Sequence, residues 1–577
     1  MHDARLIVLL GMMLTLSAGC PSTRQQPKKE SKPSGSPRAL AERPAAKRPT
    51  VEREAAVLLL PPAEPLPKLA EQPASMILTV SAQEAAVAPM AQAATESRKS
   101  SAAPTRTGKH SGMPFDPIKE NGPIFDGWPK RPQAAIVITG VEEGYIEPCG
   151  CAGLDRMKGG MSRRATFIEG LRKQGWPLVV LDVGGIARGF GRQAEMKFHT
   201  MVEGKFRMGY NAIAFGATDL RLPAGELVSV AAGSEGNPSR FVSANVGLFG
   251  PPGEINPTNL VVRAGGLRIG VTAILGTKYQ QEIKNAEVAF TDPTAALAKI
   301  VPELARKAGY LVLLAHATRA ESEELGRKFP QFNVVVTSDG PELPPKRAAT
   351  IAGTKTLLIT VGHKGMDAIV LAPLDGPNRT ALYQRVPLDS RFPASSEMKI
   401  LMAAYQDQLK TIGFAELGLR PVAYALSERN GRFVGSAKCE SCHEKSYEIW
   451  KKSGHGRAYK TLADLDPPRN FDPECVSCHV VGWHPTRFFP YAGGYESPEK
   501  TKHLFNTGCE DCHGPGEKHC NAELGSNEKL QETYRKAMVV GKADAKKQQC
   551  ISCHDLDNSP DFNFDAYWPL IEHKEKE

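Results

Sequence analysis

Four short segments near the carboxyl end of the chain decide its architecture: Cys439-Glu-Ser-Cys442-His443, Cys475-Val-Ser-Cys478-His479, Cys509-Glu-Asp-Cys512-His513 and Cys550-Ile-Ser-Cys553-His554. Each is a C-x-x-C pair followed at once by His. This spacing is typical of c-type haem attachment, in which the two sulfurs bind the haem covalently and the adjacent imidazole is the proximal iron ligand. A zinc half-site or a disulfide can account for one such motif, but hardly for four. The sequence therefore predicts four covalently bound haem c groups.

The sixth ligand of each iron is predicted by counting histidines. Besides the four proximal ones, residues 439–577 contain five more: His455, His484, His503, His519 and His573. The only Met in this segment is Met538, so His/Met ligation can serve at most one haem. We therefore expect mostly bis-His, low-spin irons, which carry electrons and have no vacant position for substrate. A spare His can instead be a solvated side chain or a propionate partner, and we expect this most for His484 and His503.

The region 431–577 resembles the tetrahaem cytochrome c-554 family. The matching stretches are Trp450 to His455, Gly508 to His519 around the third motif, and Phe564 to Pro569 before His573. The resemblance implies closely stacked haems that act as an electron wire, with His455 and His519 at distal-ligand positions. One member type of the family keeps a five-coordinate haem, so a single open iron remains an alternative.

The middle of the chain has a different pattern, in which short β-branched runs alternate with amphipathic stretches. The expected strands are residues 134–139, 178–182, 212–215, 241–246, 267–274, 310–315, 332–337, 356–361 and 366–372, and helices are expected at 161–174 and 294–307. Such alternation predicts an α/β sandwich of sheets covered by helices over about 131–390. A stripe of Met398, Leu401, Met402, Tyr405 and Leu409 predicts a connecting helix within 391–430.

Several middle segments resemble the catalytic domain of 5'-nucleotidase-type metallophosphoesterases, which have a calcineurin-like fold. They are residues 159–166, 181–185, 208–219 and 242–246, and the resemblance covers about 131–375. That family holds two divalent ions that activate a water. The resemblance implies metal ligands from an Asp-x-His after the first strand, a bridging Asp, an Asn-His pair and a closing His-x-His. Here no Asp-x-His follows residues 134–139, and Gly185 stands in place of the bridging Asp. Ala217-Thr218 stands in place of the Asn-His pair, and Asp339-Gly340-Pro341 aligns with the closing His-x-His. His316 stands alone at a ligand position, so we expect a structural histidine and no divalent metal.

In place of the first metal motif lies a pair of cysteines, Cys149-Gly150-Cys151. Two thiols separated by one glycine can chelate a soft metal, bind a sulfur species or cycle as a strained disulfide. They can equally be inert thiols that shape a loop. Cys149 and Cys151 are the candidate redox pair of this part of the chain.

The amino-terminal end predicts export. An eleven-residue apolar run, residues 6–16, suits a signal peptide and is too short to span a bilayer. It leads to Leu-Ser-Ala-Gly-Cys20, which resembles a bacterial lipoprotein processing site and implies a signal peptide at 1–19 and lipidation of Cys20. An ordinary secretory signal is the alternative. Residues 20–130 lack periodicity and are predicted to be a disordered tether. We expect a periplasmic, lipid-anchored protein.

Composition limits the remaining possibilities. The chain has 577 residues and a formal net charge of +9, which eight haem propionates would largely offset. The leading hypothesis is an electron-transfer protein that serves redox partner proteins, contacts a membrane through Cys20 and binds no nucleic acid. Its phosphoesterase-like domain would bind a ligand or partner. The alternatives are a redox enzyme acting on a small nitrogen or sulfur compound, and an active phosphoesterase with a rearranged metal centre.

Overall fold

The computed structural model describes residues 115–149, 154–234, 236–374 and 381–573. The predicted signal peptide, Cys20, Cys151 and most of the predicted tether lie outside these residues. All described residues belong to one structural unit. Within them, no helix is both long and apolar enough to cross a membrane.

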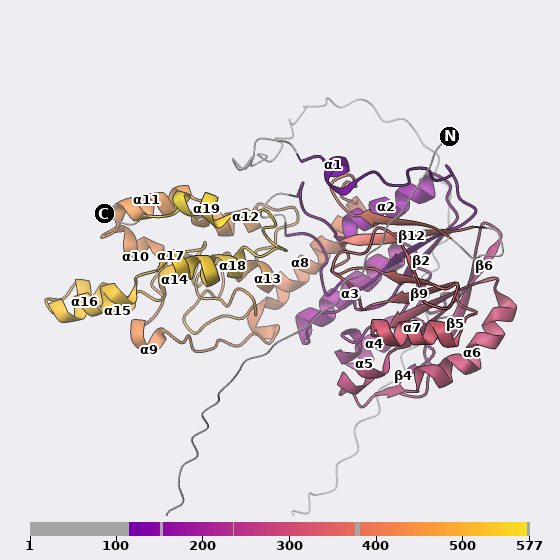
Figure 1. Cartoon of the computed structure of the whole chain (residues 1–577). Helices are drawn as coiled ribbons and strands as arrows, with labels where there is room; N and C mark the ends of the chain where they lie inside the picture. The colour runs from indigo at the N-terminus through magenta and orange to yellow at the C-terminus, as the bar shows by residue number, and fades with distance from the viewer. Residues whose placement is uncertain (1–114, 150–153, 235, 375–380, 574–577) are drawn as a thin grey trace, which may run out of the picture. The chain divides into compact units, whose positions relative to one another are not determined.

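The first sheet has five strands in the order β13-β12-β1-β2-β3 (Figure 1). They are β1 (Ala135–Thr139), β2 (Leu178–Asp182), β3 (Ala212–Ile213), β12 (Asp367–Pro373) and β13 (Ala381–Pro387). Strand β1 runs parallel to β2, with Ile136 opposite Val179, and antiparallel to β12, with Ile136 opposite Leu371.

The second sheet has six strands in the order β10-β11-β9-β8-β6-β5, and β4 and β7 form a separate pair. The strands are β5 (Asn259–Ala264), β6 (Leu267–Leu275), β8 (Tyr310–His316), β9 (Val334–Thr337), β10 (Ala349–Thr350), β11 (Leu357–Thr360), β4 (Val246–Leu248) and β7 (Val288–Phe290). Strand β6 is parallel to β8, which places Leu275 opposite His316 at the carboxyl edge of the sheet.

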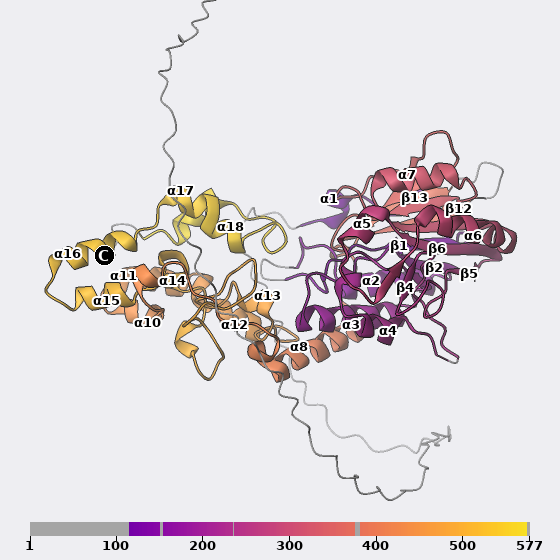
Figure 2. The ribbon, with the colours of Figure 1, turned by 90° about the horizontal axis from the view of Figure 1, so that it is seen from below.

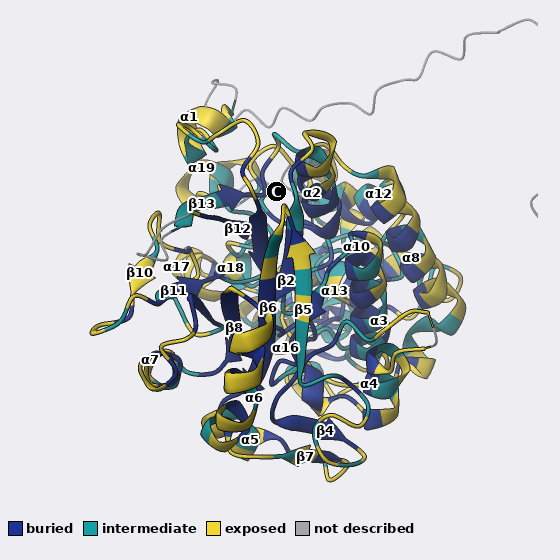
Figure 3. Cartoon of the chain, turned by 90° about the vertical axis from the view of Figure 1, so that its right-hand side faces the viewer, coloured by how far each residue is buried: buried dark blue, intermediate teal, exposed yellow. Residues whose placement is uncertain are grey.

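The alternation of side chains along β1 explains how the two sheets pack. Ile136 and Ile138 belong to the apolar cluster shared with β6 and β8 of the second sheet. Ala135 and Val137 belong to the cluster formed with the surrounding helices. Because successive side chains of a strand point to opposite faces, one strand contributes to both cores. The buried strands of both sheets are visible in Figure 3.

Helices cover the outer faces of the sheets. They are α2 (Met161–Lys173), α3 (Arg192–Arg207), α4 (Ala224–Ala231), α5 (Thr277–Glu282), α6 (Pro293–Lys307), α7 (Arg319–Lys328) and the 3-10 turn η1 (Asp219–Arg221), with α1 (Pro117–Asn121) preceding β1. The side chain of Asp292 accepts a hydrogen bond from Ala295 N and so caps α6. The predicted α/β sandwich is confirmed.

Several strands are shorter than the sequence predicts: β3 covers only Ala212–Ile213 of 212–215, and of the predicted strand 241–246 only Val246 belongs to a strand, β4. Phe241 makes an isolated bridge with Ile213. The hydroxyl of Ser243 accepts from the backbone N–H groups of Asn245 and Val246, and this local turn competes with the sheet ladder.

Helix α8 (Ser396–Glu416) joins the two halves of the chain and lies within the predicted range 391–430. The Ser395 side chain caps it, and Met398, Leu401, Met402, Tyr405 and Leu409 are buried as the apolar stripe predicted. Gly413 adopts φ 72°, which interrupts regular helix geometry near the end. Helices α2, α3 and α8 pack together (Figure 2).

The carboxyl part contains short helices and turns. They are α9 (Ser427–Asn430), α10 (Ser436–Glu440), α11 (Glu444–Lys452), η2 (His455–Arg457), α12 (Ala458–Ala463), α13 (Pro473–Val476), η3 (Lys502–Leu504), α14 (Cys509–His513), α15 (Glu517–Glu523), α16 (Glu528–Ala537), α17 (Lys542–Asp544), η4 (Ala545–Gln549), α18 (Cys550–Cys553), α19 (Phe564–Tyr567) and η5 (Trp568–Leu570). A small core forms around Tyr459, Trp483 and Tyr495. The predicted mainly helical region is confirmed.

Candidate haem centres

Each C-x-x-C-H motif lies on a short helical turn. The first, second, third and fourth motifs fall on or directly after α10, α13, α14 and α18. In the first motif His443 N donates to Cys439 O at 2.9 Å, and in the fourth His554 N donates to Cys550 O at 2.9 Å. One turn of backbone therefore carries the two sulfurs and the imidazole together, as attachment to a single haem requires.

Three of the proximal imidazoles face another imidazole. The ring centroids of His443 and His519 are 6.1 Å apart. Those of His455 and His554 are 6.0 Å apart, and those of His513 and His573 are 5.8 Å apart.

These separations fit the requirement of bis-His ligation. Two imidazoles that bind opposite faces of one metal ion have centroids about 6 Å apart, because a metal–nitrogen bond is about 2 Å long and the centroid lies about 1 Å behind the nitrogen. The residues present therefore fit iron between each of the three pairs.

The other spare ligands lie elsewhere. The His484 ring packs against Phe489, with centroids 5.1 Å apart, and its Nδ1 accepts from Thr486 N. His503 lies in η3, and its carbonyl is close to Gly435. The Met538 sulfur contacts Asn430 Nδ2 at 4.0 Å.

Hydrogen bonds fix the orientation of three proximal rings. His479 Nδ1 donates to Ala458 O and His513 Nδ1 donates to Met538 O, both at 2.6 Å. His554 Nδ1 and Ser559 Oγ are hydrogen-bonded at 3.0 Å. Binding Nδ1 in this way leaves Nε2 for a metal and sets the basicity of the ligand. Sequence reasoning missed these partners: two are backbone carbonyls, which carry no residue-type signal, and the third is the hydroxyl of Ser559, which belongs to no motif.

Burial keeps the imidazoles neutral, as metal ligation requires. Burial, together with the nearby His455 and His479, lowers the pKa of His554 to about 4. Burial also lowers the pKa values of His455, His479, His513 and His519. At neutral pH these rings present a lone pair.

The four motifs come together in two pairs. The Cys439 and Cys509 side chains are hydrogen-bonded to each other, and so are those of Cys478 and Cys553. These thiols stand for the thioether sulfurs of the attached haems. The first motif therefore neighbours the third, and the second neighbours the fourth.

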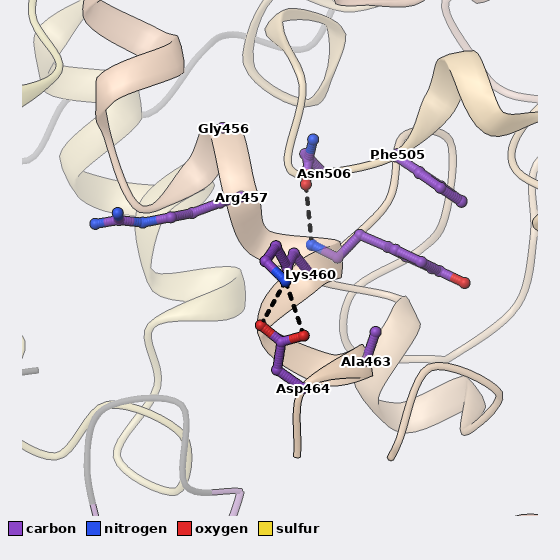
Figure 4. Close-up of a pocket in the computed structure, with 8 residues that line it drawn as sticks. Gly456, Arg457, Lys460, Ala463, Asp464, Phe505 and Asn506 are labelled. Atoms are coloured by element: carbon purple, nitrogen blue, oxygen red, sulfur yellow. Dashed lines mark hydrogen bonds and ion pairs between the residues drawn. The ribbon is translucent and has the colours of Figure 1, made fainter. Parts of the chain in front are cut away.

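Two cavities adjoin the motifs. One, of about 420 Å³, is lined by α12 residues and by Arg457, Phe505 and Asn506 (Figure 4). Asn506 Oδ1 accepts from Tyr459 N, and Tyr459 follows Ala458, the partner of His479. The other, of about 180 Å³, is lined by Cys512, His513 and Gly514. Both cavities lie within one or two residues of an imidazole or its hydrogen-bond partner.

The structure places the α/β residues that the sequence aligns with the family's metal-ligand positions. Nearby in the sequence, Glu143 hydrogen-bonds His363 at 2.9 Å. His316 is buried, and its Nδ1 is 3.0 Å from Val183 O. A Cβ on Gly185 would lie 3.3 Å from His316 Cε1 and 3.2 Å from Val141 Cα, so the backbone leaves little room for a longer side chain.

Asp219 accepts from the N–H groups of Gly185, Ala187 and Gly216. Asp339 accepts from Arg319 N. In the described residues no group of three or more His, Cys, Asp and Glu can hold a metal ion.

A buried ionic cluster lies beside this position. Lys205 Nζ contacts Glu142 Oε1 at 2.6 Å and also the Asp182 carboxylate, and Arg164 contacts Glu142 at 2.7 Å. Thr139 Oγ1 donates to Asp182 at 2.6 Å. Lys205 and Arg164 partly offset the effect of burial, which raises the pKa of Glu142. No motif in the sequence pointed to Lys205.

Cys149 lies next to the second motif. Arg469 Nη1 donates to Pro148 O at 2.9 Å and to Cys149 O at 3.5 Å. Cys149 also contributes to the electrostatic environment of both Cys475 and Cys478. Its predicted partner Cys151 lies outside the described residues.

Comparison with known proteins addresses the carboxyl part directly. Residues 438–514 match the family model of cytochrome c554 and c-prime. Cytochrome c-554 of Nitrosomonas europaea is 32% identical over an alignment of 149 residues, and the match covers 22% of this chain and 60% of that protein. The chain thus spans less than two thirds of the relative that it matches. The predicted resemblance to the cytochrome c-554 family is confirmed, and it implies covalently bound haem c.

Solved structures similar to this chain include nucleotidases. The 5'-nucleotidase precursor of Thermus thermophilus has 21% identity and a TM-score of 0.42, with 48% of this chain and 59% of that chain covered. The NAD nucleotidase of Haemophilus influenzae has 14% identity and a TM-score of 0.40, with 53% and 64% covered.

Proposed function

We propose that this protein is an exported tetrahaem c-type cytochrome whose function is electron transfer. The observation that carries the proposal is the set of three imidazole pairs with centroids 5.8 to 6.1 Å apart, each containing one proximal His. Bound haem supplies an iron that is reversibly oxidised and reduced by one electron. The three imidazole pairs would hold such irons and would leave them no open position for substrate, which favours electron transfer over substrate binding.

The surrounding residues hold the axial ligands in place. Three proximal rings are held through Nδ1 by hydrogen bonds to Ala458, Met538 and Ser559. Burial disfavours protonation of the imidazoles. The contacts Cys439–Cys509 and Cys478–Cys553 support two close pairs of haems. Short distances between neighbouring groups are what a chain of electron carriers needs.

The cellular setting of this proposal rests on the sequence. The apolar run 6–16 and Cys20 support export and a lipid anchor in a bacterial membrane, and covalent haem attachment in bacteria also occurs outside the cytoplasm. The partners would be redox proteins that donate and accept electrons.

We assign the α/β part a binding role and expect no divalent metal in it. Gly185 stands where the resemblance expects the bridging Asp, and a Cβ at this position would lie 3.3 Å from His316 Cε1. A module of this kind would present its surface to a ligand or partner and leave electron transfer to the haems.

Mass spectrometry tests the haem count. The full chain, produced with a c-type haem maturation system, should carry the mass of four haems, and haem peptides should cover all four motifs. A Cys475→Ser/Cys478→Ser variant should lose one haem. Replacing Cys520, which lies in α15 outside the motifs, by Ser is the matched control and should lose none. A wild-type chain with fewer than four haems would contradict the proposal.

A second candidate function is a redox enzyme acting on a small nitrogen or sulfur compound. It is favoured by the position of Cys149, whose charge would affect the Cys475 and Cys478 sites. This candidate predicts a spectral shift of the oxidised or reduced protein with nitrite, hydroxylamine or carbon monoxide. Spectra that stay unchanged with all three compounds would count against it.

A further inference from the structure

The short helix that begins the second motif is held by side chains of α3 and α8. Asp472 is the N-cap residue of α13, and it is buried, with 4% of its surface exposed. Its Oδ1 accepts from Gln193 Nε2 of α3 at 3.0 Å, and its Oδ2 accepts from Gln406 Nε2 of α8 at 3.0 Å. These hydrogen bonds give the first turn of α13 a fixed place against the α/β part.

A buried cation of α3 contacts the same turn. Lys197 Nζ lies 2.6 Å from Glu474 Oε1, and the Lys197 side chain is only 9% exposed. The ammonium also donates to Gly144 O at 3.2 Å. Glu474 directly precedes Cys475, the first cysteine of the second motif. The α/β part therefore places a positive charge on the neighbour of a haem attachment residue.

The Lys197 ammonium keeps its charge in this position. Burial by itself would lower the pKa of Lys197, but the carboxylates of Glu474 and Asp472 outweigh burial and hold the pKa above its ordinary value. Solvent and salt screen a buried charge much less than an exposed one. The field of this cation therefore extends into the surrounding protein.

We propose that Lys197 sets the redox potential of the haem attached at Cys475 and Cys478, so that the α/β part controls one carrier of the electron-transfer chain. This inference rests on the proposed haem attachment at the second motif. A fixed positive charge near a haem favours the reduced state, because the reduced iron carries one positive charge less than the oxidised iron. The hydrogen bonds of Asp472 keep the motif at a constant distance from that charge.

The test uses the full-length, haem-loaded protein and measures its four midpoint potentials by optical redox titration. Lys197→Met keeps the length of the side chain but removes its charge, and it should lower the potential of one haem. Glu474→Gln removes the opposite charge and should raise the potential of the same haem. In the double variant the two shifts should largely cancel, whereas two purely structural defects would not.

Three controls assign the effect to this charge and this haem. Lys197→Arg keeps the charge and should leave all four potentials near their wild-type values. Lys307→Met removes the exposed partner of Glu303 in α6 and should move none of them. Adding Lys197→Met to the Cys475→Ser/Cys478→Ser chain, which lacks the haem in question, should leave the three remaining potentials in place.

Three outcomes would overturn the inference. The first is unchanged potentials in both Lys197→Met and Glu474→Gln at full haem content. The second is a shift of the same sign in these two variants, because a disturbed fold and not a charge would then be the cause. The third is a Lys197→Met shift that persists in the chain without Cys475 and Cys478.

Two further measurements keep the test decisive. The Glu474 side chain is 39% exposed, so Glu474→Gln remains informative if Lys197→Met fails to fold. Mass spectrometry of the wild type separates this inference from the function on which it rests. Absence of haem from the 475–478 peptide would show that the proposed function fails at this motif, whereas haem present with unchanged potentials would refute only the role of Lys197.

Discussion

The imidazole rings of His513 and His573 lie with their centroids 5.8 Å apart and their planes at 46°, although one belongs to the third motif and the other lies at the end of the described chain. If both bind one iron, His573→Ala should convert that haem from low-spin to high-spin. Electron paramagnetic resonance of the oxidised protein would show the change. His484→Ala is the control, because His484 packs against Phe489, and it should leave the spectrum unchanged. A His573→Ala protein that stays fully low-spin would remove this pair from the account.

Counting histidines predicted that spare ligands exist but could not assign them. His455 follows the first motif in sequence, yet it faces His554 of the fourth motif. His519 follows the third motif and faces His443 of the first. Each pairing depends on how distant short helices pack, and no local periodicity encodes that. The α/β sandwich was more accessible to prediction, because its strands are continuous apolar runs such as Tyr310–His316.

The hydrogen bond between His554 and Ser559 should adjust one haem potential. If Ser559 Oγ accepts from Nδ1, it makes the imidazole a stronger donor to the iron and favours the oxidised state. Ser559→Ala should then raise the potential of the haem on Cys550 and Cys553 and leave the other three in place. Ser229→Ala is the control, because the Ser229 hydroxyl donates to Glu226 O within α4 of the α/β part, outside the haem motifs. A redox titration in which both variants behave alike would refute the assignment.

Lys205 should be essential to the stability of the α/β part. It is buried against Glu142 and Asp182, and removing one partner of a buried ion pair costs about 3–5 kcal/mol. Lys205→Met should lower the free energy of unfolding by that amount, as measured by denaturant titration followed by circular dichroism. Lys173→Met breaks an exposed pair with Glu169 and should cost less than about 1 kcal/mol. Equal stability of the two variants would contradict this reading of the cluster.

Glu147 should make stability depend on pH. Burial raises its pKa to about 7 from an ordinary value of 4.5. The native state therefore holds the proton more tightly than the unfolded state. The stabilisation is complete below about pH 4.5 and is lost as the pH rises towards 7.

Relative to Glu147→Gln, the wild type should lose on the order of 2 kcal/mol between pH 4.5 and 7, a figure reduced because the residue is not fully shielded from water. Denaturant titrations at several pH values would measure the difference. Glu169→Gln, at an exposed position, should follow the wild-type curve. A wild type and a Glu147→Gln variant with parallel curves would show that the carboxyl titrates normally.

The central claim is that paired imidazoles bind haem iron. Quantitative electron paramagnetic resonance of the oxidised, haem-loaded chain tests it most directly, because each low-spin ferric haem contributes a countable signal. The three imidazole pairs predict at least three low-spin haems per chain, and carbon monoxide added to the reduced protein should leave those three unchanged. A spectrum dominated by high-spin iron would contradict the account.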